Sequence, residues 1–137
     1  MKSNITSLCL MALLSLVTIL TCSTLTWSAE PLSPEQLYTA NCARCHGHEG
    51  EGFLKVYPPI HNSRFLKEDV SHLPCIIRNG LRGEITVGDT TFNQIMPAMT
   101  RVTTEEMTAI IGFMQQKWNH PTTELQVEQW LSQCNSQ

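Results

Sequence analysis

The sequence predicts a mostly α-helical fold, a single small domain with one short β-hairpin that follows an apolar leader. Two residue patterns and the chain length support this prediction. Ser33 and Thr103 each stand before a run with apolar residues at helical spacing, which is typical of helix starts. Residues 85–92 alternate in the way that short strands do. The 137 residues contain no internal repeat and no low-complexity linker, so they suffice for one compact domain.

The N-terminal segment, residues 1–29, is predicted to be a signal peptide. Lys2 is its only charged residue, and a long apolar run follows that ends in small residues. The run is about as long as the ~20 residues that span a bilayer, so an uncleaved N-terminal anchor is the alternative. Hydroxyl side chains dilute its second half, which favours cleavage. In both cases residues 30–137 form an exported domain, periplasmic or anchored facing the periplasm.

The first helix of this domain is predicted over residues 33–45. Ser33 is a good N-cap, and Pro34 suits the first helical position. Glu35 is favourable near the positive end of the helix dipole. A glycine-rich stretch that starts at Gly47 is expected to end the helix and to form a loop.

Two shorter elements are predicted in the middle of the domain. A short helix near residues 74–79 is expected to end at Gly80, because glycine is the usual helix stop. Residues 85–92 are predicted to form a β-hairpin that turns at Gly88 and Asp89.

Two more helices are predicted in the C-terminal part. Thr103 and Glu106 have the spacing of a capping box and open a helix over residues 104–118. Its apolar face consists of Met107, Ile110, Ile111 and Met114. After Pro121, Thr123 is expected to cap a last helix over residues 124–133.

Composition excludes several classes of function. Nine basic residues stand against twelve acidic ones, which argues against a nucleic-acid-binding protein. With 42% hydrophobic and only 15% charged residues, the chain is not expected to be disordered. No Ser/His/Asp set, phosphate-binding loop or spaced carboxylate pair indicates an enzyme.

The strongest motif is Cys-x-x-Cys-His, formed by Cys42, Cys45 and His46. This spacing is typical of c-type haem attachment, in which two thioethers hold the porphyrin and the histidine ligates the iron. A redox disulfide would not need the histidine, and no βαβ pattern surrounds the motif. A structural zinc site would need a second ligand pair, which His61 and His72 do not supply at finger-like spacing. The motif therefore predicts one covalently attached haem c.

Around this motif the sequence resembles the class I monohaem cytochromes c, small exported bacterial haem proteins. The resemblance covers residues 34–118. Its motifs are Tyr38, Cys42-x-x-Cys45-His46-Gly47, Gly50-x-Gly52, Pro58-Pro59-Ile60, Gly80-Leu81, Met96-Pro97 and the helix from Glu106 to Trp118. It implies the class I cytochrome c fold, in which helices wrap around one covalently bound haem, here with an extra C-terminal helix.

The resemblance also implies which residues surround the iron. His46 would be the proximal ligand and Met96 the distal ligand, with Met99 as the alternative. In this family a proline carbonyl about a dozen residues after the histidine accepts its ring N–H, and Pro58 stands there. Ile60 would then press on the haem plane.

Other residues have less specific expectations. Arg78, Arg82 and Trp118 are expected to be surface or packing residues, with contact to a haem propionate as the alternative. Histidines expected to be solvated rather than ligating are His48, His61, His72 and His120. A docking patch for partners is expected around Ala43, Ile95, Pro97 and Ala98. Tyr38 is expected to pack where the first and the last long helix cross.

Two further cysteines of the exported domain, Cys75 and Cys134, are not used by the haem motif. An even pair in an oxidising compartment predicts a disulfide, which would tether the last helix. Two free buried thiols are the alternative.

A haem iron with histidine and methionine ligands has no open position, which predicts electron transfer rather than catalysis. The expected partners are a redox protein that donates electrons and one that accepts them. The alternatives are a haem subunit of a periplasmic dehydrogenase or oxidase complex, a ligand-binding or peroxidase-like cytochrome, and an exported module without haem. Membrane association is expected only if the leader is retained.

Overall fold

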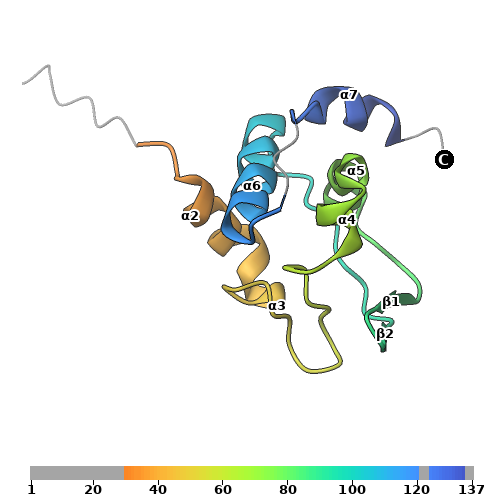
Figure 1. Ribbon diagram of the computed structural model, residues 1–137. Coiled ribbons are helices and arrows are strands. Elements are labelled where there is room, and N and C mark those ends of the chain that lie inside the picture. Colours follow the sequence, from red (N-terminus) through yellow and green to blue (C-terminus); the bar gives the residue numbers. More distant parts are fainter. Residues whose placement is uncertain (1–29, 121–123, 135–137) are drawn as a thin grey trace, which may run out of the picture. The chain divides into compact units, whose positions relative to one another are not determined.

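Helices make up most of the fold, as predicted, and a two-stranded antiparallel sheet is joined to them (Figure 1). The computed structural model describes residues 30–120 and 124–134. The predicted leader, Pro121 and the predicted cap Thr123 lie outside the described residues. The described residues from Leu32 onward belong to one compact unit. Among the described helices, none has the length and apolar character needed to cross a membrane.

The first predicted helix is present and continuous up to the haem-attachment motif. It consists of α2 (Pro34–Tyr38), a π-helical turn (Thr39–Ala43) and α3 (Arg44–His46). Ser33 caps it, since its side chain accepts the backbone N–H of Gln36 at 3.3 Å. The π-helical turn was not predicted, and it contains the first cysteine of the motif. Such turns are frequent at functional sites.

The middle of the chain contains two short helical elements that were not predicted. These are α4 (Arg64–Lys67), capped by Ser63, and a 3₁₀ turn (Val70–His72). They lead directly into the predicted helix, α5 (Leu73–Asn79), which ends at Gly80 with φ 74°. Elements of three or four residues are too short for hydrophobic periodicity to reveal.

The predicted hairpin is also present. It consists of β1 (Ile85–Val87) and β2 (Thr90–Phe92), with Ile85 paired to Phe92. Gly88 in the turn has φ 59°, the left-handed conformation that favours glycine in such turns.

Helix α6 (Thr104–Lys117) has the predicted capping box. The Thr103 side chain accepts the Glu106 backbone N–H, and the Glu106 carboxylate accepts the backbone N–H of Thr103.

Helix α7 (Val127–Ser132) begins three residues later than predicted. Its preceding residue, Gln126, makes no side-chain cap hydrogen bond. The residues before it are non-helical and bring Leu125 over Gly112 of α6, a contact that the sequence did not reveal.

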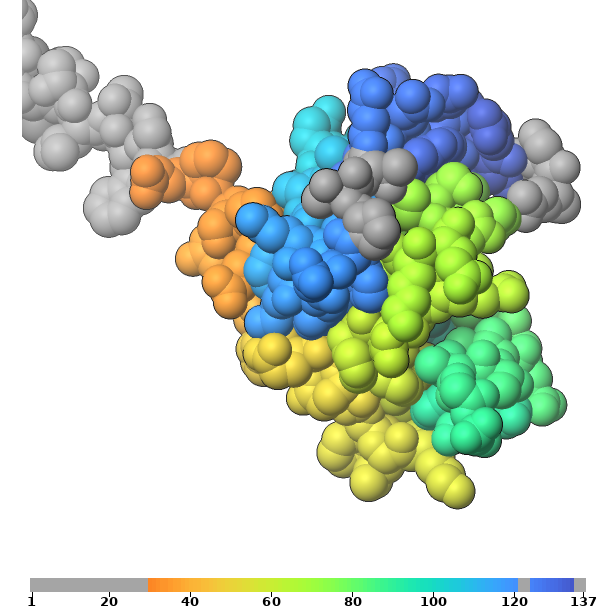
Figure 2. Space-filling model, in the orientation of Figure 1, coloured from red at the N-terminus to blue at the C-terminus, as the bar shows by residue number. Residues whose placement is uncertain are grey.

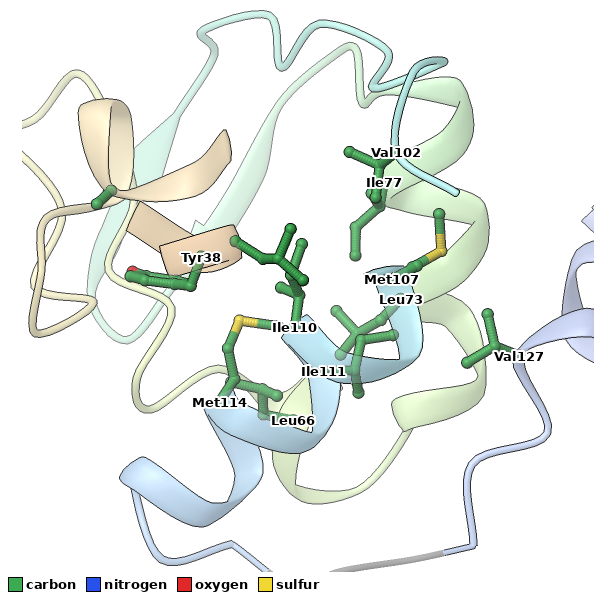
Figure 3. Packing of buried hydrophobic residues seen from close by; sticks show 12 residues of the cluster. Tyr38, Leu66, Leu73, Ile77, Val102, Met107, Ile110, Ile111, Met114 and Val127 are labelled. Atoms are coloured by element: carbon green, nitrogen blue, oxygen red, sulfur yellow. The ribbon is translucent and has the colours of Figure 1, made fainter. Parts of the chain in front are cut away.

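The hydrophobic core lies between these helices (Figure 3). Tyr38 is fully buried and contacts Phe113 and Trp118 at ring-centroid distances of 5.6 and 5.7 Å. Its hydroxyl donates to the Gly47 carbonyl at 2.7 Å, so the buried polar group is satisfied. The expected packing of Tyr38 where α2 crosses α6 is therefore confirmed.

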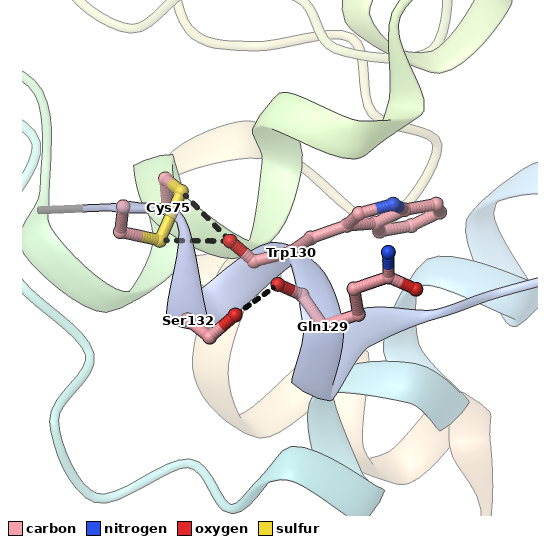
Figure 4. The surroundings of a disulfide bond; sticks show 5 residues. Cys75, Gln129, Trp130 and Ser132 are labelled. Carbon is pink, nitrogen blue, oxygen red and sulfur yellow. Dashed lines mark hydrogen bonds between the residues drawn. A yellow bond between two sulfur atoms is a disulfide. The ribbon is translucent and has the colours of Figure 1, made fainter. Parts of the chain in front are cut away.

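A disulfide joins Cys75 of α5 to Cys134 just after α7, as the leftover pair of cysteines predicted (Figure 4). Both sulfur atoms lie near the carbonyl oxygen of Trp130, at 3.7 and 3.5 Å. The C-terminal helix is thus linked covalently to the helix that ends at Gly80.

Candidate cofactor site

The three residues of the Cys-x-x-Cys-His motif lie at the C-terminal end of the first helical stretch. Cys42 is in the π-helical turn, and Cys45 and His46 are in α3. All three line the same hollow in the protein. The helix end therefore presents two thiols and one imidazole to a single space.

This hollow shares part of its wall with a second one. Residues that line both are Cys42, His46, Pro58, Ile77, Leu81, Ile85 and Met96. They come from the π-helical turn, α3 and the loop after it, from α5 and the residues that follow it, and from the hairpin and the segment between the hairpin and α6. The first hollow measures about 790 Å³ with the space open to solvent included.

The imidazole of His46 is oriented by a hydrogen bond to the Pro58 carbonyl at 3.0 Å. A carbonyl only accepts, so Nδ1 is the protonated nitrogen and Nε2 keeps a free lone pair. Burial lowers the pKa of His46, and the bond to Pro58 opposes part of that effect. A neutral imidazole with one fixed N–H is the form that ligates a metal.

The loop after α3 holds Pro58 in position against His46. The Gly52 N–H donates to the His46 carbonyl at 2.8 Å, and the Ile60 N–H donates to the Gly50 carbonyl at 2.8 Å. Gly52 has φ 72°, and a Cβ there would lie 2.4 Å from the Tyr57 carbonyl oxygen. Only glycine allows this close return of the chain.

The two motif cysteines are half-buried and form no disulfide. Burial, together with the neighbouring Cys45, raises the pKa of the Cys42 thiol to about 12.

Met96 is brought to the hollows by pairing with the end of α5. The backbone groups of Leu81 and Met96 exchange two hydrogen bonds of 3.0 Å each. Gly80 makes this approach possible, since a Cβ there would lie 2.4 Å from the Met96 carbonyl oxygen. Met99 lines only the first hollow, whereas Met96 lines both, as His46 does.

The remaining lining is largely apolar. Ile60 lies in the second hollow, beside Leu66, Leu73 and Phe65. Leu81, part of the Gly80-Leu81 motif, lines both hollows, and so does Ile77 of α5, which was not singled out from the sequence. The apolar residues at helical spacing in α5 are the signal that would have identified this wall.

The three residues for which propionate contact was the alternative do not line either hollow. Arg78 donates from Nη1 to the Thr100 carbonyl at 3.1 Å, and Arg82 is exposed. Trp118 packs against Tyr38 and over Gly50. The Nε1 of Trp118 is buried with no hydrogen-bond partner among the described residues.

The expectation that the other histidines are solvated is wrong for two of them. His61 is half-buried and bonds through Nδ1 to the Gly50 carbonyl at 2.9 Å. His120 bonds through Nε2 to the His61 carbonyl at 2.7 Å. His48 is exposed, and His72 pairs with Asp69 at 2.6 Å. The described residues contain no cluster of three or more metal-ligating His, Cys, Asp or Glu side chains.

The expected docking patch also needs one correction. Ala43 is buried at 8% exposure because the π-helical turn faces it into the core, so it cannot contact a partner. Ile95 is 50% exposed, and Pro97 and Ala98 are exposed beside it.

A second exposed apolar group was missed. Phe53, Leu54 and Val56 all lie in the loop after α3, whose neighbouring Tyr57 lines the first hollow. In Figure 2 this loop (yellow) and the hairpin (green) stand as separate protrusions at the lower edge.

These residues fit a covalently attached haem. Two thiols at haem-attachment spacing, a neutral imidazole and a thioether sulfur line one largely apolar space. Soft thioether and imidazole ligands suit haem iron, and the apolar walls suit the porphyrin.

Comparison with known proteins gives the same result. The cytochrome c family model matches residues 35–118. Cytochrome c-552 of Thermus thermophilus is 28% identical over 83 residues, which cover 58% of this chain and 63% of that protein. A second cytochrome c-552 of this species is 28% identical over 83 residues and is covered to 56%. The chain thus spans less than two thirds of the length of these relatives.

Proposed function

The chain belongs to the cytochrome c family and binds haem c covalently, and we propose that it carries single electrons between redox proteins through an iron ligated by His46 and Met96. The observation that carries this proposal is that both residues line the same two hollows as Cys42. Met99, the alternative ligand, lines only one of them.

Cys42 and Cys45 would hold the haem through two thioether bonds, and the bound haem supplies an iron that changes between the ferric and ferrous states. His46 keeps one ring nitrogen for the iron, because the other donates to Pro58. This hydrogen bond also increases the basicity of the imidazole. The apolar walls exclude water, which with the methionine sulfur favours a high reduction potential.

With His46 and Met96 both bound to the iron, the site would leave no position open for oxygen or a substrate. Electron transfer through the haem edge therefore fits this site better than ligand binding or peroxidase chemistry, and we assign the protein no enzymatic reaction of its own. Its direct partners would be one redox protein that donates an electron and one that accepts it.

The domain is proposed to work outside the cytosol, in the periplasm. Residues 1–29 would be a signal peptide or a retained anchor, and residues 30–137 the exported cytochrome domain. The bridge between Cys75 and Cys134 supports this, because disulfides persist in oxidising compartments. No partner among nucleic acids is proposed, since acidic residues outnumber basic ones.

One observation favours a second candidate, a haem subunit of a periplasmic dehydrogenase or oxidase complex. Phe53 is 59% and Leu54 78% exposed within one loop next to the cofactor site. Clustered exposed apolar side chains are typical of protein interaction sites. A lasting complex would appear as an enzyme that co-purifies with the native protein.

The proposal is tested on holoprotein made with a cytochrome maturation system. Haem should stay on the protein after acid-acetone extraction, and the Cys42→Ala/Cys45→Ala variant should lose it. The reduced protein should bind carbon monoxide poorly at neutral pH. Extractable haem in the unchanged protein would refute covalent attachment, and avid carbon monoxide binding would refute the six-coordinate site.

A further inference from the structure

The segment that carries Met96 lies outside helices and strands and is held by the end of one helix. Residues 96–100 lie in the connection between the hairpin and α6, which spans residues 93–103. Three backbone hydrogen bonds tie this segment to α5 and the residue after Gly80. They are the two bonds between Leu81 and Met96, at 3.0 Å each, and one from Met99 N–H to the Ile77 carbonyl at 2.9 Å.

A fourth bond comes from a side chain. Arg78, in the last turn of α5, donates from Nη1 to the carbonyl of Thr100 at 3.1 Å. Thr100 is four residues after Met96, so this bond attaches the far end of the segment to α5. The near end, at Met96, is already bound to Leu81, just after the same helix. The guanidinium therefore spans from α5 to the loop and does not line the cofactor hollows.

We propose that Arg78 is a positioning residue for the Met96 loop, and that it lowers the fraction of molecules in which the loop has moved away from the iron. This inference rests on the proposed ligation by Met96. Arg78 is not among the residues that line the hollows and donates to the Thr100 carbonyl, so it would act through that bond.

The consequence is measurable because an added ligand binds the iron only where Met96 has left it. Its apparent affinity equals its intrinsic affinity multiplied by the fraction of open molecules. Removing one net hydrogen bond should raise that fraction about 2- to 10-fold. Since opening precedes binding of any such ligand, imidazole and cyanide should gain by the same factor.

The experiment is a titration of ferric holoprotein with imidazole and, separately, with cyanide. Arg78→Ala should increase both affinities about 2- to 10-fold, and Arg78→Lys, which keeps one cationic donor, should recover part of the difference. Arg101→Ala is the matched control. Arg101 is exposed, follows Thr100 directly, and makes no hydrogen bond or ion pair within the described residues. This variant should bind both ligands as the unchanged protein does.

Unchanged affinities in Arg78→Ala would overturn the inference. Unequal changes for neutral imidazole and for cyanide would also overturn it, because they would show that Arg78 acts through its charge on the iron. Met96→Ala separates this inference from the proposed ligation. It should abolish the far-red sulfur-to-iron absorption band, and a band that survives it would refute Met96 as the ligand.

Discussion

Removing the disulfide should destabilise the domain by about 4 kcal/mol. The bridge joins Cys75 to Cys134 across a sequence separation of 59 residues. In the chain-entropy model, a closed loop of that length restricts the unfolded chain by about 4 kcal/mol at 25 °C. For a domain of this size the loss corresponds to a fall of roughly 15 °C or more in Tm.

The structure indicates that the loss of stability should be largest at the C-terminal helix α7. Helix α7 has only six residues, too few for an isolated helix to be stable. Val127 is buried and Trp130 and Leu131 are partly buried against the core, so α7 depends on its attachment to α5. Without the bridge, the C-terminus should become sensitive to proteolysis while the haem absorption spectrum stays nearly unchanged.

The assay is equilibrium denaturation of the Cys75→Ala/Cys134→Ala holoprotein beside the unchanged protein. Far-ultraviolet circular dichroism gives the free energy of unfolding, and limited proteolysis reports the C-terminus. A loss below ~1 kcal/mol would refute the loop-closure reasoning. Two thiols that titrate in the unfolded, unreduced protein would refute the bridge itself.

Three further predictions concern the cofactor site and the core. Met96→Ala should lower the reduction potential in a redox titration, whereas Met99→Ala should leave it close to that of the unchanged protein; the reverse result would make Met99 the ligand. Tyr38→Phe removes the hydrogen bond to the Gly47 carbonyl and should lower the free energy of unfolding, measured by urea denaturation, by ~1–3 kcal/mol. An unchanged free energy of unfolding would contradict a stabilising role for this bond. Gly80→Ala places a Cβ 2.4 Å from the Met96 carbonyl oxygen, at a residue whose φ is 74°. It should therefore destabilise the fold by ~1–3 kcal/mol and weaken the far-red absorption band. An unaffected band would show that the loop around Met96 tolerates the change.

Features with a local physical cause were predictable from the sequence. The caps Ser33 and Thr103 satisfy N–H groups within three residues, and both helices begin where these caps predict. The hairpin follows from residue alternation and from a turn that needs a glycine with positive φ. The haem-attachment motif is likewise a matter of spacing within five residues.

The sequence alone also indicated the disulfide, by counting cysteines in an exported chain. It did not show where α7 begins, because Leu125 packs over Gly112 from a distant part of the chain. The same limit applies to His61 and His120, whose partners are backbone carbonyls brought near by folding.

The arrangement of the methionines and of Arg78 was decided by the tertiary structure. In the sequence, Met96 and Met99 differ only by position beside a proline, and Arg78 is one of several arginines. The backbone pairing of Leu81 with Met96 brings Met96 to both hollows, and the same approach brings the Thr100 carbonyl within reach of Arg78. Local patterns determined the two capped helices that begin after Ser33 and Thr103, the hairpin and the attachment motif of this protein, because their interactions lie within a few residues. The packing of α5 against the loop decided the rest, because contacts between distant residues exist only after folding.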